Sequence, residues 1–339
     1  MVPRDLAPSR VEQTLCVLLP VAAWCCYAPL GLKYAAWLTV VLLSAAVVQH
    51  RRGWRAAWQG AGPGLLLGLF ALLSLSALWS PASWPRIGTH LWMYSLPLGA
   101  ALLAWACPPA AARRALRHFA LASGCVGALS LLQGTNALPH WVAWDSTITA
   151  TGNQRIVTSV LLALGGAWAC WLAAGERTPG RRALWLVVAA VAGAGLASQD
   201  RRTGMLLLPT LLLAWALATP HRTLLKAALV TLVGLGALGV WTASDSVRAR
   251  FAEGALELRS YEPRDDIATS WGQRVRMFEL TVGMVAERPL TGHGLGSWQV
   301  KWRERVAPGT PLAPNSTPHN EYLMIAAQAG APAALLLLG

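Results

Sequence analysis

The chain has 339 residues, of which 55% are hydrophobic and 13% charged, and its mean hydropathy is +0.44. Soluble domains carry about 25% charged residues, so this composition argues against a water-soluble enzyme, a nucleic-acid-binding domain and a disordered chain. The net charge of +13 comes from short basic clusters between apolar runs, the pattern that orients a membrane protein in its bilayer. A multi-pass membrane protein is the class that remains.

Ten apolar segments approach the length of about 20 residues that a membrane-spanning helix needs. The sequence therefore predicts an all-α polytopic membrane protein with about ten transmembrane helices. Because the last segment stops at Gly339 within an apolar run, we expect further helices in the natural protein. The ten predicted spans are 12–30, 31–49, 62–79, 88–107, 115–133, 156–174, 182–198, 203–219, 223–243 and 322–339.

The basic residues between these segments alternate in number along the chain. Thirteen fall on one side and five in the short connections of the other. Positive residues concentrate in cytoplasmic loops, which predicts a cytoplasmic N-terminus and an outward-facing loop after the ninth span. The predicted organisation is transmembrane helices one to nine in 1–243, a large outer loop domain in 244–321, and the start of the C-terminal helices in 322–339.

The outer loop holds 20 of the chain's 43 charged residues, in equal numbers of each sign, so it reads as a folded cap rather than a basic tail. Helical spacing of apolar residues predicts helices over 246–258 and 271–286. Pro289 is expected to end the second helix, and the glycine-rich stretch 292–296 to form a turn.

Two groups of arginines on the predicted outer side are candidate anion sites. Arg201 and Arg202 lie in a very short link between two spans, where they form either an interfacial pair with Asp200 or a guanidinium fork for a phosphate or diphosphate. Arg276 lies off the apolar stripe of its predicted helix. It either pairs with Glu279 at the surface or binds an anion.

A histidine directly before the last span is the candidate base. Thr317 and Pro318 predict the N-cap and first residue of that helix, which places His319 in its first turn. The positive end of the helix dipole disfavours an imidazolium ion there, and a neutral imidazole can accept a proton from a hydroxyl. The alternative is an interfacial histidine that solvates the helix end.

No motif for a nucleotide, flavin or metal cofactor is found, so we expect no cofactor and no metal site. Carboxylates are missing from the middle of the predicted spans, which argues against an ion-coupled transporter. A lipid-linked glycan carrier or flippase remains the alternative from another class. Trp141 and Trp144 lie near predicted span ends, where interfacial anchoring is the usual role of tryptophan. The alternative is that Trp141, Trp144 or Trp298 stacks on sugars.

The order of these features resembles the O-antigen ligase family of bacterial inner membranes over about 150–335. The resemblance depends on the outward Arg-Thr-Gly, the arginine-bearing loop helix, Pro-Leu-Thr-Gly-His-Gly at 289–294, and Pro-His-Asn at 318–320. It implies a GT-C-like glycosyltransferase that acts at the periplasmic face of the inner membrane. Its donor would be a glycan on undecaprenyl diphosphate and its acceptor the lipid A–core, with membrane lipids around it and no nucleic acid.

The resemblance also implies roles for particular residues. His319 would be the general base, and Arg276 and Arg202 would stabilise the leaving diphosphate in an inverting, metal-independent transfer. Related polymerases and protein O-oligosaccharyltransferases share the pattern and remain alternatives for the acceptor. The candidate substrate-binding residues on the same side are Arg201, Arg155, Arg288, Asn320 and His293.

Overall fold

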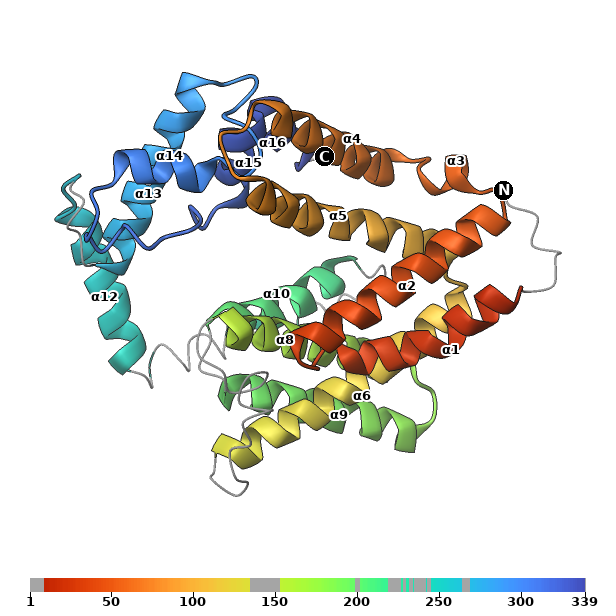
Figure 1. The fold of residues 1–339 in the computed structure, drawn as a ribbon. Coiled ribbons are helices and arrows are strands. Elements are labelled where there is room, and N and C mark those ends of the chain that lie inside the picture. The colour runs from red at the N-terminus through yellow and green to blue at the C-terminus, as the bar shows by residue number, and fades with distance from the viewer. Residues whose placement is uncertain are drawn as a thin grey trace. The chain divides into compact units, whose positions relative to one another are not determined.

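The computed structural model describes residues 9–134, 153–198, 202–218, 245–263 and 269–338, with isolated positions between 219 and 244. The described residues form helices and connecting turns, with no strand among them. The helices divide into two compact units, each built from two separate stretches of the chain (Figure 1). Unit 1 takes 1–51 and 105–239, and unit 2 takes 52–104 and 240–339.

Unit 1 is a bundle of long apolar helices. Ser9 caps its first helix and accepts a hydrogen bond from the backbone of Glu12, whose carboxylate accepts one from the backbone of Ser9 in return. This reciprocal capping defines where the chain becomes helical. The described helices are α1 Arg10–Cys25, α2 Leu30–His50, α6 Pro109–Gly134, α8 Asn153–Gly175, α9 Pro179–Ser198 and α10 Arg202–Ala218.

Glycines allow the helices of unit 1 to approach closely. A Cβ atom on Gly195 of α9 would lie 2.3 Å from Cα of Gly127 in α6. A Cβ on Gly204 of α10 would lie 2.5 Å from the carbonyl oxygen of Ser159 in α8. Small residues at such crossings increase the van der Waals contact on which membrane helix packing depends.

Unit 2 combines membrane-type helices with the amphipathic helices of the outer loop. One hydrophobic core of unit 2 contains Trp298 and Trp302, which stack with ring centroids 4.9 Å apart and are both fully buried. Their indole N–H groups donate to Oγ1 of Thr281 and the carbonyl of Leu312. The helices are α3 Trp54–Ala57, α4 Ala61–Ser76, η1 Ala77–Trp79, α5 Trp84–Ala106, α12 Asp245–Arg259, α13 Ser270–Glu287, α14 Trp298–Arg305, α15 Glu321–Ala329 and α16 Ala331–Leu336.

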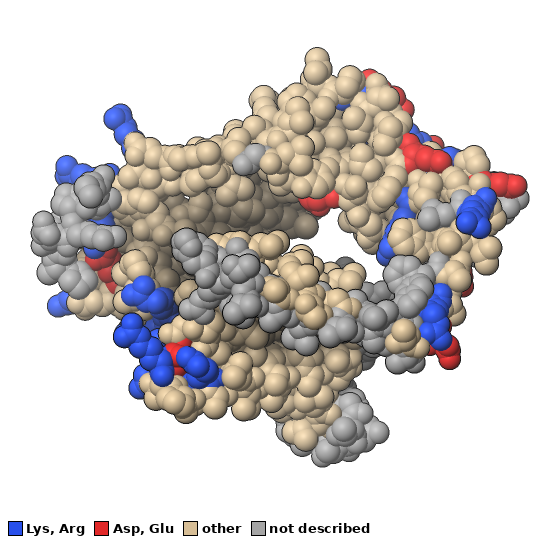
Figure 2. Space-filling view, turned by 180° about the vertical axis from the view of Figure 1, so that it is seen from behind, with Lys and Arg blue, Asp and Glu red and all other residues tan. Residues whose placement is uncertain are grey.

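Five helices in the described part of the chain are long and apolar enough to cross a membrane. They match the predicted spans at 31–49, 62–79, 115–133, 156–174 and 182–198, and are Gly31–His50, Ala61–Trp79, Pro109–Gln133, Ile156–Gly175 and Pro179–Ser198. The predicted spans at 88–107 and 203–219 are also helical, as α5 and α10, whereas the predicted span at 12–30 is helical only to Cys25, where α1 ends. Most of 223–243 lies outside the described residues. On the face drawn in Figure 2, uncharged side chains form most of the surface, and Lys and Arg gather in a few places.

The predicted span at 322–339 is corrected to two short helices, α15 and α16. They are separated at Gly330, whose φ of 86° ends the first helix. A Cβ there would lie 2.2 Å from the carbonyl oxygen of Leu290, and the backbone N–H of Ala331 donates to the carbonyl of Pro289 at 2.7 Å. The break thus accommodates the chain segment before the glycine-rich turn.

The predicted helices of the outer loop are confirmed. α12 and α13 cover the predicted ranges, and α13 ends at Glu287, just before Pro289. The stretch 292–296 forms a turn, as predicted. α14 had no counterpart in the sequence prediction.

Candidate functional site

The glycine-rich turn, residues 292–296 and hereafter the glycine loop, lies against α15. The N–H groups of His293 and Gly294 donate to the carbonyls of Ala327 and Gln328 at 2.9 and 2.8 Å, and the N–H of Gly296 donates to the side-chain oxygen of Gln328. Gly292, Gly294 and Gly296 have φ values of 63°, 100° and 76°, which other residues rarely adopt. Glycine is therefore needed at these three positions because the backbone of the loop is left-handed there.

The glycine loop also lies against the start of α5. The hydroxyl of Ser80 donates to the carbonyl of Leu295 at 2.6 Å. A Cβ on Gly296 would lie 3.3 Å from Cγ of Arg86 and 3.6 Å from Cδ2 of His90. A side chain at position 296 would therefore press on Cγ of Arg86 and on the imidazole ring of His90.

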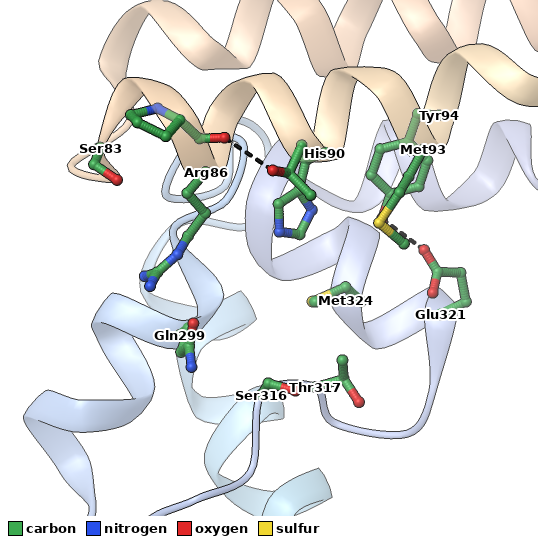
Figure 3. Close-up of a pocket in the computed structure, with 12 residues that line it drawn as sticks. Ser83, Arg86, His90, Met93, Tyr94, Gln299, Ser316, Thr317, Glu321 and Met324 are labelled. Atoms are coloured by element: carbon green, nitrogen blue, oxygen red, sulfur yellow. Dashed lines mark hydrogen bonds between the residues drawn. The ribbon is translucent and has the colours of Figure 1, made fainter. Parts of the chain in front are cut away.

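A pocket of about 480 Å³ in unit 2 is lined by α5, α14, α15 and the loop that carries Ser316 and Thr317 (Figure 3). Arg86 and His90 extend from α5 toward the side of the pocket formed by Gln299 and the loop that carries Ser316 and Thr317. The Tyr94 hydroxyl, farther along α5, donates to Oε1 of Glu321 at 2.6 Å. The lining residues are Ser83, Pro85, Arg86, Thr89, His90, Met93, Tyr94, Gln299, Ser316, Thr317, Glu321 and Met324.

His319 lies between two pocket-lining residues, Thr317 and Glu321, and its side chain is exposed. The prediction that Thr317 and Pro318 begin the helix is wrong. Asn320 is the N-cap, and its side-chain oxygen accepts the N–H of Leu323 at 3.1 Å. His319 therefore precedes the helix, with a φ of 54°. The reason is that Asn caps a helix as well as Thr does, and a left-handed residue before it prevents an earlier start.

Arg276 is half-buried on α13 and pairs with Glu279 at 3.4 Å, which was one of the two alternatives that the sequence left open. Glu279 also accepts a hydrogen bond from the hydroxyl of Tyr261 at 2.6 Å. Burial, together with this carboxylate, raises the pKa of Tyr261 to about 12. Arg276 is thus bound to an acidic group that Tyr261 also binds.

Two of the candidate substrate-binding residues differ in exposure. Arg288 is exposed at the C-terminal end of α13. His293 is 5% exposed, and its Nε2 lies 2.9 Å from the carbonyl oxygen of Met284 and 3.4 Å from Glu287. The contacts of His293 therefore attach the glycine loop to α13.

The remaining candidate arginines, Arg155, Arg201 and Arg202, belong to unit 1. Arg202 begins α10 and Arg155 lies in the first turn of α8, and the side chains of both, like all of Arg201, lie outside the described residues. Gly204, two residues after Arg202, is in close contact with Ser159. The glycine of Arg-Thr-Gly therefore sets how closely the start of α10 approaches α8.

Sequence reasoning did not identify Arg86 and His90. Their spacing with Tyr94, at positions i, i+4 and i+8, places all three on one helix face, and polar groups near the end of a predicted span are a functional signal.

Trp298 is a core residue, since only 1% of it is exposed, which excludes it as a sugar platform. Trp141 and Trp144 lie outside the described residues. The described residues contain no group of three or more His, Cys, Asp or Glu arranged to hold a metal ion.

Comparison with curated proteins found no match to the chain. A family model described as O-Antigen ligase matches residues 185–338, from α9 through α16. The match includes Arg202, Arg276, the glycine loop and His319, whereas Arg86 and His90 precede it. Together with the apolar helices, it indicates a multi-pass membrane protein with O-antigen ligase or polymerase-type activity. The resemblance seen in the sequence is thereby confirmed: residues 185–338 form a domain of the O-antigen ligase family.

Proposed function

We propose that the protein transfers a glycan from undecaprenyl diphosphate to a sugar hydroxyl of the lipid A–core, at the periplasmic face of the bacterial inner membrane. The match of 185–338 to the O-antigen ligase model is the observation that carries this proposal. The apolar helices supply surfaces for a polyprenyl tail, and the predicted orientation places the outer loop in the periplasm.

In the proposed reaction, His319 removes the proton from the acceptor hydroxyl. The hydroxyl oxygen attacks the anomeric carbon while the bond from that carbon to the diphosphate oxygen breaks, so the configuration inverts. Undecaprenyl diphosphate leaves with the bonding electron pair. Arg202 and Arg276 stabilise the negative charge that grows on it, since fixed cations act most strongly where charge develops.

The backbone of His319 supports its proposed role. A non-glycine residue with a φ of 54° is strained by about 1–2 kcal/mol, and such strain concentrates at functional sites. The N-cap of Asn320 and the bond from the His319 N–H to Oγ1 of Thr317, at 3.4 Å, hold this conformation. The side chain is exposed in the segment between two pocket-lining residues, and is therefore accessible to an acceptor.

Replacement of His319 tests the base directly. His319→Ala should lower glycan transfer by purified protein at least 100-fold, while binding of the lipid-diphosphate donor stays within twofold. The matched control is His50→Ala, at the exposed end of α2, which should transfer normally. Near-normal transfer by His319→Ala would remove His319 as the base.

Arg276 has a matched control on its own helix. Arg276→Gln should lower transfer about 100-fold, the effect of removing one donor to a developing negative charge. Arg274→Gln should have little effect, because Arg274 is exposed and stacks on Trp271, 5.7 Å from the ring centroid. Equal transfer rates for the two variants would exclude Arg276 from the reaction.

The acceptor is distinguished by supplying candidates separately. We expect product with lipid A–core, whereas product only with a second lipid-linked glycan or with a protein would indicate a polymerase or a protein O-oligosaccharyltransferase. A carrier would move the donor across the bilayer and form no glycosidic bond with any acceptor.

The transfer should also be independent of metal ions. The proposal would be contradicted if a chelator stopped glycan transfer and added divalent ion restored it.

A further inference from the structure

None of the residues that line the pocket in unit 2 takes part in the proposed chemical step, and the polar groups of the pocket form a pattern of their own. We propose that it binds an anionic group, a phosphate or a carboxylate, attached to a sugar, with Arg86 and His90 at the anion and Glu321 at the sugar hydroxyls. The choice of a sugar as the carrier of the anion rests on the proposed function. The anion could belong to the glycan acceptor or to the lipid-diphosphate donor, and the experiment below separates the two.

Arg86 is the cation of this site. It is half-buried and lines the pocket, and its guanidinium group has no hydrogen bond or ion pair to any described residue. A partly desolvated guanidinium ion gains most from an anion that can accept two of its N–H groups. Phosphate and carboxylate both offer that geometry.

His90 supplies a second donor. Its Nδ1 is buried and has no hydrogen-bond partner among the described residues. A neutral imidazole carries its proton on one of the two ring nitrogens, and a buried N–H without an acceptor is more costly than a bare lone pair. The proton is therefore on Nε2, at the far end of a side chain that extends into the pocket (Figure 3). The N–H there is a donor to the same anion as Arg86.

Glu321 of α15 places a negative charge at the part of the pocket that lies beside Tyr94. The carboxylate accepts the hydroxyl of Tyr94 through Oε1, and its side chain is exposed at the pocket. Arg86 and Glu321 form no ion pair with each other, so both charges stay open to a ligand. A carboxylate accepts hydrogen bonds from neutral hydroxyl groups, which a sugar provides and an inorganic anion does not. Met93, Met324 and Pro85 add apolar surface for a sugar ring.

The surrounding fold holds Arg86 and His90 in place. Gly296 lies close to Cγ of Arg86 and to the imidazole ring of His90, with room for no more than a hydrogen atom between them without a shift, and its N–H is bonded to Gln328 of α15. The bond from Ser80 to Leu295 attaches the start of α5 to the same loop. Binding sites depend on such support because a rigid site loses little entropy when its ligand binds.

The test measures binding by the purified full chain in detergent, with a hexose 6-phosphate, the neutral hexose and inorganic phosphate as probes. We expect the hexose phosphate to bind most tightly of the three. Arg86→Gln should weaken it at least tenfold, and His90→Asn should weaken it several-fold. The control is Arg303→Gln, an exposed arginine on α14 of the same unit, which should bind as the wild type does. Thermal unfolding checks that each variant is folded, and Arg86→Lys, which keeps the charge but loses the fork, replaces Arg86→Gln if that variant unfolds.

Two results would overturn the proposal: equal binding of hexose phosphate by Arg86→Gln and Arg303→Gln, or binding of the neutral hexose as tight as that of its phosphate. In glycan-transfer assays of Arg86→Gln, a raised KM for the acceptor alone assigns the anion to the acceptor. A raised KM for the donor alone assigns it to the diphosphate. If the wild type binds hexose phosphate through Arg86 but forms no glycosidic bond, the binding site is supported and the proposed function is wrong. If the wild type transfers glycan normally but binds hexose phosphate without help from Arg86, the proposed function is supported and the binding site is wrong.

Discussion

Units 1 and 2 both depend on glycine, but for different physical reasons. In unit 1, Gly127, Gly195 and Gly204 are helical, and their value is the space that a missing Cβ leaves for a neighbouring helix. In unit 2, Gly296 and Gly330 have positive φ values and connect helices. Unit 1 is thus held by close helix packing, and unit 2 by a backbone path that hydrogen bonds stabilise.

This difference predicts how each unit responds to mutation. Packing where Gly195 meets Gly127 and where Gly204 meets Ser159 is sensitive to added volume and insensitive to pH, because the atoms in contact there belong to groups that do not titrate. The glycine loop and the ion pairs of unit 2 are sensitive to backbone strain and to charge. Four experiments test the contrast, from the largest expected effect to the smallest.

The largest effect is expected where two helices of unit 1 touch. Gly195→Val would place side-chain atoms where the backbone of Gly127 lies, 2.3 Å from the Cβ position, and should lower the free energy of unfolding by about 3 kcal/mol or more. Gly180→Val, in the same helix but with nothing within 4 Å of its Cβ position, is the control. Thermal unfolding in detergent measures both, and equal Tm values would contradict close packing at this crossing.

The second experiment separates backbone strain from contact in unit 2. Gly296 and Gly309 have similar φ values, 76° and 83°, but only Gly296 has close neighbours. Alanine at either position should cost about 1–2 kcal/mol from strain. Only Gly296→Ala should also displace Arg86 and His90 and weaken hexose phosphate binding, which titration of both variants measures. If Gly309→Ala weakens binding equally, the contact with Gly296 has no role in the pocket.

Much of the helical architecture could be predicted from local sequence. The apolar runs predicted the five membrane-length helices, and the spacing of apolar residues predicted α12 and α13. The break at Gly330 could not be predicted, because it depends on a carbonyl from Leu290, 40 positions earlier in the chain. The helix start at Asn320 was missed because the local signals of Thr317, Pro318 and Asn320 compete, and tertiary packing decides among them.

The candidate site could be predicted only in part. The pairing of Arg276 with Glu279 follows from their spacing on one helix and was one of the two alternatives that the sequence offered. The pocket was not expected, since it brings α5 together with α15, and Tyr94 and Glu321 are 227 residues apart in the chain. One sequence contains no information on such distant pairs. The sequence also could not show that His293 is buried. It was a candidate substrate-binding residue because of its motif, but its side chain is packed inside the protein.

The third experiment removes a hydrogen bond from the Arg276 network. Because its folded-state pKa is raised to about 12 from a usual value of about 10, Tyr261 stabilises the fold below pH 10 and loses that contribution as pH rises toward 12. Tyr261→Phe should cost about 1 kcal/mol at neutral pH. The difference in Tm between variant and wild type should shrink between pH 10 and 12. For Gly195→Val, the difference in Tm from the wild type should stay constant over the same pH range. An equal change with pH for both variants would contradict the proposed difference between the two units.

The smallest effect concerns an exposed ion pair at the end of α13. Arg305 donates to both carboxylate oxygens of Glu287, at 2.5 and 2.7 Å, and holds the pKa of Glu287 below its usual value. A depressed pKa means that the folded state binds the proton more weakly, so the contribution to stability is present above the ordinary glutamate pKa and disappears as pH falls through the folded-state value. Since exposed pairs contribute about 0.5 kcal/mol, Glu287→Gln should lower the Tm slightly at pH 7, and the variant and wild type should converge at acidic pH. Glu253→Gln on α12, also exposed, should match the wild type throughout. A difference for Glu287→Gln that persists unchanged at low pH would show that its side chain stabilises unit 2 by packing rather than by charge.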